Sequence, residues 1–322
     1  MSVVNERGAH EPVLTDEVMA ALSVAPGDTV VDATLGGAGH FKRLLAELGE
    51  NGVIVGIDAD GEAVERARDA YAEDRRPERP VAHLVNDNFR NLERILERLG
   101  VASVDAILFD LGWSGFQIAS PRGFSFTNPE EPLLMTYGQG GETAADIINS
   151  ATEDTLADIL VRYGEERFAR PIARAIVAAR SEERILTVGQ LNAAVLAGTP
   201  IWYQKRRLHP ATKVFQAFRI AANDEMGALS EGLAAALTVL APGGRLAVIA
   251  FHSVEDRVVK QALREAVAEN RGTTLKKPVV PTRAETLRNR RARSAKLRVF
   301  TRAPRESAAP PFERVLPTLS YA

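Results

Sequence analysis

The stretch that decides the fold is Val30-Val31-Asp32-Ala33-Thr34-Leu35-Gly36-Gly37-Ala38-Gly39-His40-Phe41. Its first residues are β-branched and predict a short strand, its glycines predict a turn, and residues 41–48 have the apolar spacing of a helix. Glycine lets a backbone pass close to a ligand, and the following helix presents free N–H groups. The stretch therefore predicts a nucleotide-binding strand, turn and helix, although an ordinary strand-to-helix turn has a similar pattern.

The next apolar run supports the nucleotide-binding interpretation. Residues 52–58 predict a second buried strand that ends in Asp58. In a Rossmann-like sheet, an acid at this position accepts both hydroxyls of an adenosine ribose. The turn lacks the G-x-G-x-x-G register that seats a pyrophosphate. We therefore expect a ligand with adenosine but without phosphates, and S-adenosylmethionine is the common one.

Composition narrows the class of protein. The chain has 322 residues, of which 45% are hydrophobic and 25% charged, as in an ordinary globular protein. The absence of cysteine excludes disulfides, thiolate metal sites and a cysteine nucleophile. Residues 1–10 hold no apolar core of a signal peptide, and no apolar run approaches the length of a membrane span. We expect a cytoplasmic protein with no membrane partner.

Strands and helices alternate through the first third of the chain. Residues 81–85 and 104–110 predict a third and a fourth strand, which predicts a mostly parallel sheet with helices on both faces. Ligands of such sheets lie at the carboxyl ends of the strands, where Asp32, Asp58, Phe89 and Asp110 all fall. Phe89 either contacts an adenine ring or closes the loop as a core aromatic.

The pattern changes after residue 112. Residues 114–141 are rich in Gly, Pro, Ser and Phe and predict a long active-site loop, and residues 143–225 are almost wholly helical. A helix over 228–240, a turn at Pro242-Gly243-Gly244 and a strand over 245–251 then resume the α/β pattern. We expect a discontinuous cofactor-binding domain, 1–112 and 226–322, with an inserted loop and helical substrate-recognition domain, 113–225.

Asp110-Leu111-Gly112-Trp113 is the candidate for chemistry. The lone pair of an exocyclic amine on a nucleobase is delocalised into the ring, so the amine is a poor nucleophile. A carboxylate that accepts its N–H localises the lone pair, and an aromatic ring stacks the extruded base. Asp110 would then be catalytic. Alternatively, Asp110 binds only the cofactor and Trp113 only packs.

Other polar residues have two interpretations each. His252 follows a strand beside the site and is either a base or a hydrogen-bonded structural histidine, and His209, before Pro210, is open to the same choice. The five histidines lack metal-ligand spacing, so we predict no metal. A one-sided basic run in residues 283–302 is either a solvated face or a phosphate-binding patch. Its cations are Arg283, Arg288, Arg290, Arg291, Arg293, Lys296, Arg298 and Arg302, against the single acid Glu285.

A set of motifs runs along nearly the whole chain. They are His10-Glu11-Pro12-Val13-Leu14, the Asp32 to His40 turn, Asp110-Leu111-Gly112, Arg122-Gly123-Phe124-Ser125-Phe126, Tyr163-Gly164-Glu165-Glu166-Arg167-Phe168, His209-Pro210-Ala211-Thr212, residues 214–220, residues 251–257 and residues 293–298. In these motifs and their order the chain resembles the bacterial small-subunit ribosomal RNA methyltransferase H family, which makes N4-methylcytidine in the decoding region.

The resemblance implies a class I methyltransferase sheet with a helical insertion, S-adenosylmethionine as cofactor, and small-subunit ribosomal RNA as partner within the assembled subunit. A homodimer is left open. The implied cofactor positions are Ala38, Gly39, His40, Asp58, Phe89, Asp110 and Gln117. Gln117 comes from the resemblance alone.

The chain departs from the family pattern at several positions. Ala38 stands where the family has glycine, Ser114-Gly115 replaces paired serines, residues 132–137 lose an acid and an arginine, and Lys213 replaces an arginine. Lysine gives up bidentate phosphate recognition. Two other functions stay open beside ribosomal RNA methylation. One is methylation of DNA or a small molecule, and the other is an RNA-binding assembly factor that has kept the cofactor fold.

Overall fold

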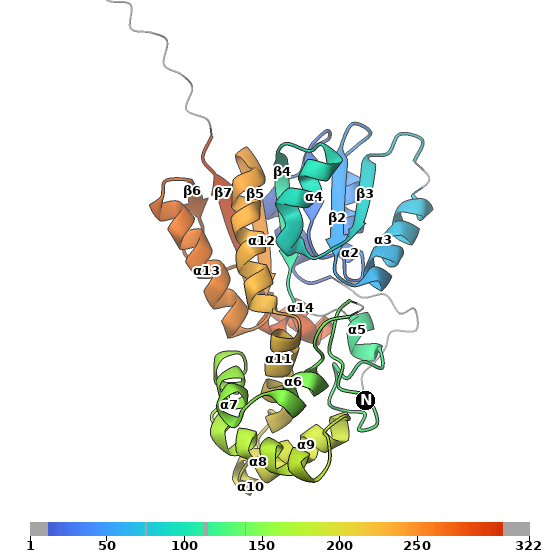
Figure 1. Ribbon diagram of the computed structural model, residues 1–322. Coiled ribbons are helices and arrows are strands. Elements are labelled where there is room, and N and C mark those ends of the chain that lie inside the picture. Colours follow the sequence, from blue (N-terminus) through green and yellow to red (C-terminus); the bar gives the residue numbers. More distant parts are fainter. Residues whose placement is uncertain (1–11, 75, 113–114, 139, 305–322) are drawn as a thin grey trace, which may run out of the picture.

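The computed structural model describes residues 12–74, 76–112, 115–138 and 140–304 (Figure 1). Its centre is a seven-stranded sheet in the order β3-β2-β1-β4-β5-β7-β6. The strands are β1 Thr29–Asp32, β2 Val53–Asp58, β3 Val81–Asn86, β4 Val104–Asp110, β5 Leu240–Ala250, β6 Gly272–Thr274 and β7 Lys296–Arg302. Strands β1 to β5 pair in parallel, and β7 runs antiparallel to both of its neighbours. The predicted Rossmann-like α/β sheet is confirmed.

Helices cover both faces of the sheet because alternate residues of each strand point to opposite sides. Val30 belongs to the core beneath α1, α2 and α3, and its neighbour Val31 to the core beneath α4, α12 and α13. These helices are α1 Thr15–Leu22, α2 Gly39–Glu47, α3 Gly61–Glu73, α4 Leu92–Leu99, α12 Glu225–Val239 and α13 Ser253–Ala268. Burial on both faces explains the continuous apolar runs in the strands.

The segment between β4 and α12 is helical and has a hydrophobic core of its own, drawn from residues 124–218. Its helices are α5 Gly115–Ala119, α6 Ala144–Ser150, α7 Glu153–Arg162, α8 Ala169–Glu182, α9 Val188–Ala197, α10 Ile201–Gln204 and α11 Pro210–Ala222. Figure 1 shows α6 to α11 beyond the edge of the sheet where the parallel strands end, with α10 at the far tip.

The structure corrects three details of the prediction. Pro242-Gly243-Gly244 is not a separate turn, because β5 runs through it and the register against β4 jumps between Val104 and Ala106. Gly243 still has a left-handed φ of 82°. Strand β6 was not predicted. The basic run was not expected to hold helices, yet it contains α14 Arg283–Arg288 and η2 Arg290–Ser294.

Candidate active site

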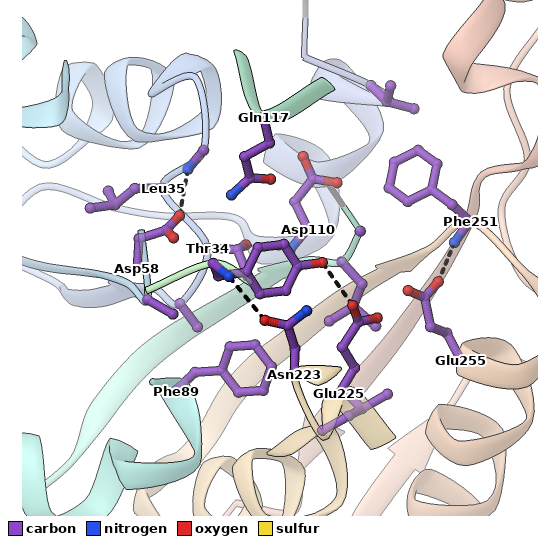
Figure 2. Close-up of a pocket in the computed structure, with 18 of the residues that line it drawn as sticks. Thr34, Leu35, Asp58, Phe89, Asp110, Gln117, Asn223, Glu225, Phe251 and Glu255 are labelled. Carbon is purple, nitrogen blue, oxygen red and sulfur yellow. Dashed lines mark hydrogen bonds between the residues drawn. The ribbon is translucent and has the colours of Figure 1, made fainter. Parts of the chain in front are cut away.

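A cavity of about 420 Å³ opens at the carboxyl ends of β1, β2, β4 and β5. Three of the four strand-end residues that the sequence singled out line it, and Figure 2 shows Asp58, Phe89 and Asp110 with Gln117 around the same hollow. Asp32 does not line the cavity: it is fully buried and accepts the Thr34 N–H at 3.2 Å. The predicted long loop also contributes, because Gln117, Ile118 and Tyr137 line the cavity. Parallel strands place their carboxyl ends at one edge, and this geometry brings together residues that are far apart in the chain.

Asp58 organises one end of the cavity. One of its carboxylate oxygens accepts the Gly36 N–H at 2.9 Å and the other accepts the Asp60 N–H at 2.9 Å. A carboxylate has about four lone-pair positions, so each oxygen retains capacity for another donor. Burial raises the pKa of Asp58 to about 6. The side chain is therefore suited to accept hydrogen bonds from two neighbouring hydroxyls.

The turn between β1 and α2 is tight and partly strained. Ala38 precedes the first residue of α2 with a left-handed φ of 59°, a conformation that disfavours a residue with a Cβ. Gly39 packs against Pro12, where an added Cβ would lie 2.9 Å from the ring. His40 is buried, with its Nε2 3.5 Å from the Asp110 Oδ2. The resemblance implied glycine at position 38, and the left-handed φ gives the reason.

Phe89 and Gln117 also line the cavity. Phe89 packs edge-on against Phe109, with ring centroids 5.3 Å apart, so it contacts both the core and the hollow. The Gln117 Nε2 donates to the Asp60 Oδ2 at 3.1 Å, which ties α5 to the first residue before α3. The structure thus places Gln117, which only the resemblance implied, beside residues reached from the strand ends.

Asp110 lies in the middle of the cavity at the end of β4 (Figure 2). Its backbone N–H donates to the Thr34 Oγ1 at 2.6 Å, which fixes the end of the strand against the glycine turn. Its Oδ1 is buried and has no hydrogen-bond partner among the residues that the structure describes. Burial and the negative charge of Glu255 raise the pKa of Asp110 to about 7. This carboxyl has a free acceptor position and titrates near neutrality.

The other end of the cavity holds a cluster of hydrogen-bonded polar side chains that the sequence did not predict. Arg219, from α11, makes a bidentate ion pair with Glu225 in which both N–O distances are 2.7 Å. The Tyr137 hydroxyl donates to the same Glu225 at 2.9 Å, and the Tyr137 N–H donates to the Asn223 side chain at 2.9 Å. Burial raises the pKa of Tyr137 well above its ordinary value. The inserted segment thereby closes one wall of the cavity.

His252 is a helix cap. Its Nδ1 accepts the Glu255 N–H at 3.2 Å, and Glu255 in turn accepts the N–H groups of Phe251 and His252 at 2.8 and 3.3 Å. This capping box starts α13 at the wall of the cavity. The side chain of His252 lines the cavity, but its main contacts support the structural interpretation.

His209 also caps a helix. Its Nδ1 accepts the Ala211 N–H at 3.2 Å at the start of α11, and its ring stacks on Phe126 with centroids 5.1 Å apart. The structural interpretation of this histidine is therefore favoured as well.

The expectation of no metal stays a prediction. Glu225, His252 and Glu255 bring ligand atoms within 4.8 Å of one another. Glu225 is committed to Arg219, however, and His252 and Glu255 are committed to the start of α13. These contacts use part of the lone-pair capacity of the three side chains.

Five cations of the basic run fall into two groups. Lys296 and Arg298 pair with Asp256 at 3.0 and 2.7 Å, and Arg302 donates to backbone carbonyls, so these cations hold β7 in place. Arg290 and Arg291, from η2, line the cavity instead. Of the two interpretations of the basic run, a phosphate-binding patch does not fit the β7 residues, whose charges are neutralised or used on the backbone.

Some predicted features lie outside the described residues. These are Trp113, which was expected to stack a base, Ser114 beside Gly115, and the His10-Glu11 part of the first motif. Within the described residues, no helix is long and apolar enough to cross a membrane.

The chain is similar to known proteins over most of its length. A family model described as the MraW methylase family matches residues 7–303. A protein of Deinococcus radiodurans named Ribosomal RNA small subunit methyltransferase H is 46% identical over 296 residues, covering 92% of this chain and 90% of the relative. Proteins of the same name from Deinococcus deserti and Dictyoglomus thermophilum are 47% and 42% identical, each over 91% of this chain and over 93% and 96% of their own.

Proposed function

Since the chain belongs to the MraW methylase family, we propose that it transfers the methyl group of S-adenosylmethionine to the exocyclic N4 of a cytidine in small-subunit ribosomal RNA. The observation that carries the proposal is Asp110, a half-buried carboxyl in the middle of the cavity whose Oδ1 is buried and has no partner among the described residues. The relatives at 42–47% identity are named as small-subunit ribosomal RNA methyltransferases. The choice of cytidine N4 rests on the resemblance and on the chemistry of Asp110.

The Asp58 end of the cavity fits the cofactor. Asp58 would hold the ribose hydroxyls, Phe89 the adenine ring, and the backbone of the turn at 36–40 the remaining part, with Gln117 closing the side. The bound cofactor supplies an electrophilic methyl group on a sulfonium. The spare acceptor capacity of Asp58 and the absence of cationic phosphate ligands in the turn both suit an adenosine without phosphates.

Asp110 would act on the target amine. Its carboxylate accepts one N–H of the cytosine amine, which holds the nitrogen lone pair toward the methyl carbon. The bound cofactor would supply the methyl group, with an N–C bond formed as the S–C bond breaks and S-adenosylhomocysteine as the leaving group, and the methylated nitrogen would lose one proton to solvent. A pKa of about 7 leaves a large fraction of Asp110 ionised at neutral pH, as an acceptor requires. Most of the rate enhancement then comes from positioning.

The substrate would approach from the side of the inserted segment. We assign 1–112 and 226–322 to cofactor binding and 113–225 to substrate recognition, which the separate core of the insertion supports. Arg290 and Arg291 stand at the cavity where the phosphates of an extruded nucleotide would pass. A target folded in the assembled small subunit, in the cytoplasm, fits a recognition domain of this size.

The test is methyl transfer from labelled S-adenosylmethionine to small subunits that lack the modification, run beside naked ribosomal RNA, DNA and a nucleoside mixture. Nucleoside analysis then identifies the product. We expect label in N4-methylcytidine and faster transfer to assembled subunits. Label in another nucleoside would overturn the choice of cytidine N4 and identify that nucleoside as the target. No label, with the cofactor bound, would favour an assembly factor whose loop at 132–137 has lost the substrate geometry.

A further inference from the structure

The tip of the helical insertion exposes large apolar side chains. Ile201 and Trp202, in α10, are 69% and 54% exposed. This tip lies at the end of the insertion that is farthest from the sheet in Figure 1. Adjacent exposed apolar side chains form a contiguous patch, and such a patch is a candidate interaction surface.

Trp202 is held rigidly from below. Its ring meets Phe168 and Tyr203 edge-on, with centroids 5.8 Å away in both cases and interplanar angles of 68° and 85°. Tyr203 is buried, and its hydroxyl donates to both carboxylate oxygens of Glu166 at 2.9 Å. The edge contacts fix the indole while leaving much of its surface accessible. A fixed, open ring loses little entropy when a flat partner stacks on it.

The surroundings of this ring are strongly cationic. From Arg184 to Asn223 the chain has no Asp or Glu and six Lys or Arg residues. Three consecutive cations, Lys205 to Arg207, follow α10 and are exposed. Arg167 is also exposed, with its guanidinium 5.6 Å from the Trp202 ring centroid. Within the described part of the chain, none of these four cations forms an ion pair with a carboxylate.

We propose that Arg167, Trp202 and Lys205 to Arg207, the α10 tip, form a second RNA-binding surface that stacks an unpaired base on Trp202 and contacts flanking phosphates with the cations. The proposal rests on the proposed ribosomal RNA substrate and adds a contact outside the cavity. Flat aromatic stacking beside unneutralised cations is the usual chemistry of single-stranded RNA recognition. A protein or a second copy of the chain would need carboxylates to match this charge, and an apolar contact alone would not require three adjacent cations.

Binding of a short RNA by the full chain tests the stacking contact. The probe is a fluorescein-labelled oligoadenylate of about 12 nucleotides, followed by anisotropy at constant salt. Trp202→Ala should weaken binding about tenfold, and Trp202→Phe, which keeps a ring, should restore most of it. Val161→Ala, at a residue of α7 that is 53% exposed, is the matched control and should bind as the parent protein does. A duplex of equal charge should be insensitive to Trp202→Ala.

The salt dependence of RNA binding tests the role of the cations in the α10 tip. Replacing Lys205, Arg206 and Arg207 by alanine should make the slope of log affinity against log salt shallower by about 2, because each single-strand phosphate contact contributes about 0.7. Replacing Lys276 and Lys277, exposed cations on the sheet domain, is the control.

Three outcomes separate this surface from the proposed function. If Trp202→Ala changes neither RNA binding nor subunit methylation, the proposed RNA-binding surface is wrong and the proposed activity is unaffected. A changed sedimentation coefficient with unchanged RNA binding would also overturn it and assign the tip to a second copy. Weaker oligoadenylate binding by Trp202→Ala, in a protein that methylates no ribosomal RNA, would support the surface while the proposed activity fails.

Discussion

Replacement of Asp110 by asparagine should separate the effect of the Asp110 charge on folding stability from its role in methyl transfer. The pKa of about 7, against an ordinary 3.8, means that the folded protein disfavours the ionised carboxyl. At about pH 8 that difference amounts to roughly 4 kcal/mol of lost stability. The asparagine side chain keeps the shape without the charge, and its amide oxygen is a weaker acceptor for an N–H than a carboxylate. We therefore expect Asp110→Asn to be more stable than the parent protein at pH 8 and to lose about a hundredfold or more in methyl transfer.

The raised pKa of Asp110 also fixes the direction in which the stability of the parent protein changes with pH. Between about pH 4 and pH 7 the folded state binds a proton at Asp110 that the unfolded state has released, so lowering the pH through this window stabilises the parent protein. At about pH 5 the cost of Asp110 falls to less than roughly 2 kcal/mol. The advantage of Asp110→Asn should thus be about 2–3 kcal/mol larger at pH 8 than at pH 5. Effects of the amide on packing are the same at both pH values and cancel.

Urea unfolding at the two pH values measures this difference. The matched control is Asp69→Asn, at an exposed residue of α3, which should change stability by less than about 0.5 kcal/mol at either pH. Cofactor titration of Asp110→Asn separates its two candidate roles, because normal binding with lost methyl transfer identifies contact with the target amine. An equal stability gain at both pH values would refute the buried-charge argument. Full methyl transfer by Asp110→Ala would refute the catalytic assignment.

Three further predictions concern the walls of the cavity. Ala38→Gly should raise the free energy of unfolding by about 1 kcal/mol in urea titrations by relieving the left-handed φ, whereas Ala46→Gly, at an exposed helical position of α2, should lower it by a similar amount. Cofactor affinity should fall about tenfold for each pH unit below about 6, because Asp58 is protonated there. Calorimetry of Asp58→Asn should show weaker cofactor binding that does not depend on pH. Arg219→Met should cost about 3–5 kcal/mol by leaving the Glu225 charge buried and unpaired, while the double change with Glu225→Gln should recover much of that loss; equal losses in both would contradict the ion-pair argument.

The local pattern of the chain was enough to predict the sheet and one end of the site. Apolar runs of strand length, each followed by a helix, placed Asp58 and Asp110 at strand ends, and parallel strands put those ends at one edge. The predicted turn between β1 and α2 is confirmed, because glycines at a strand-to-helix junction indicate a tight turn of the backbone. Gln117 had no such signal, since its place depends on the packing of α5 against Asp60.

What only the tertiary structure decided depends on contacts between distant segments. Tyr137 and Glu225 are 88 residues apart in the chain and share one hydrogen bond, and no periodicity predicts that pairing. The same holds for charge. Lys296 and Arg298 look like part of a basic patch until β7 places them on Asp256. The chain shows which residues are ionisable, but desolvation by the folded neighbours decides that Asp110 titrates near neutrality.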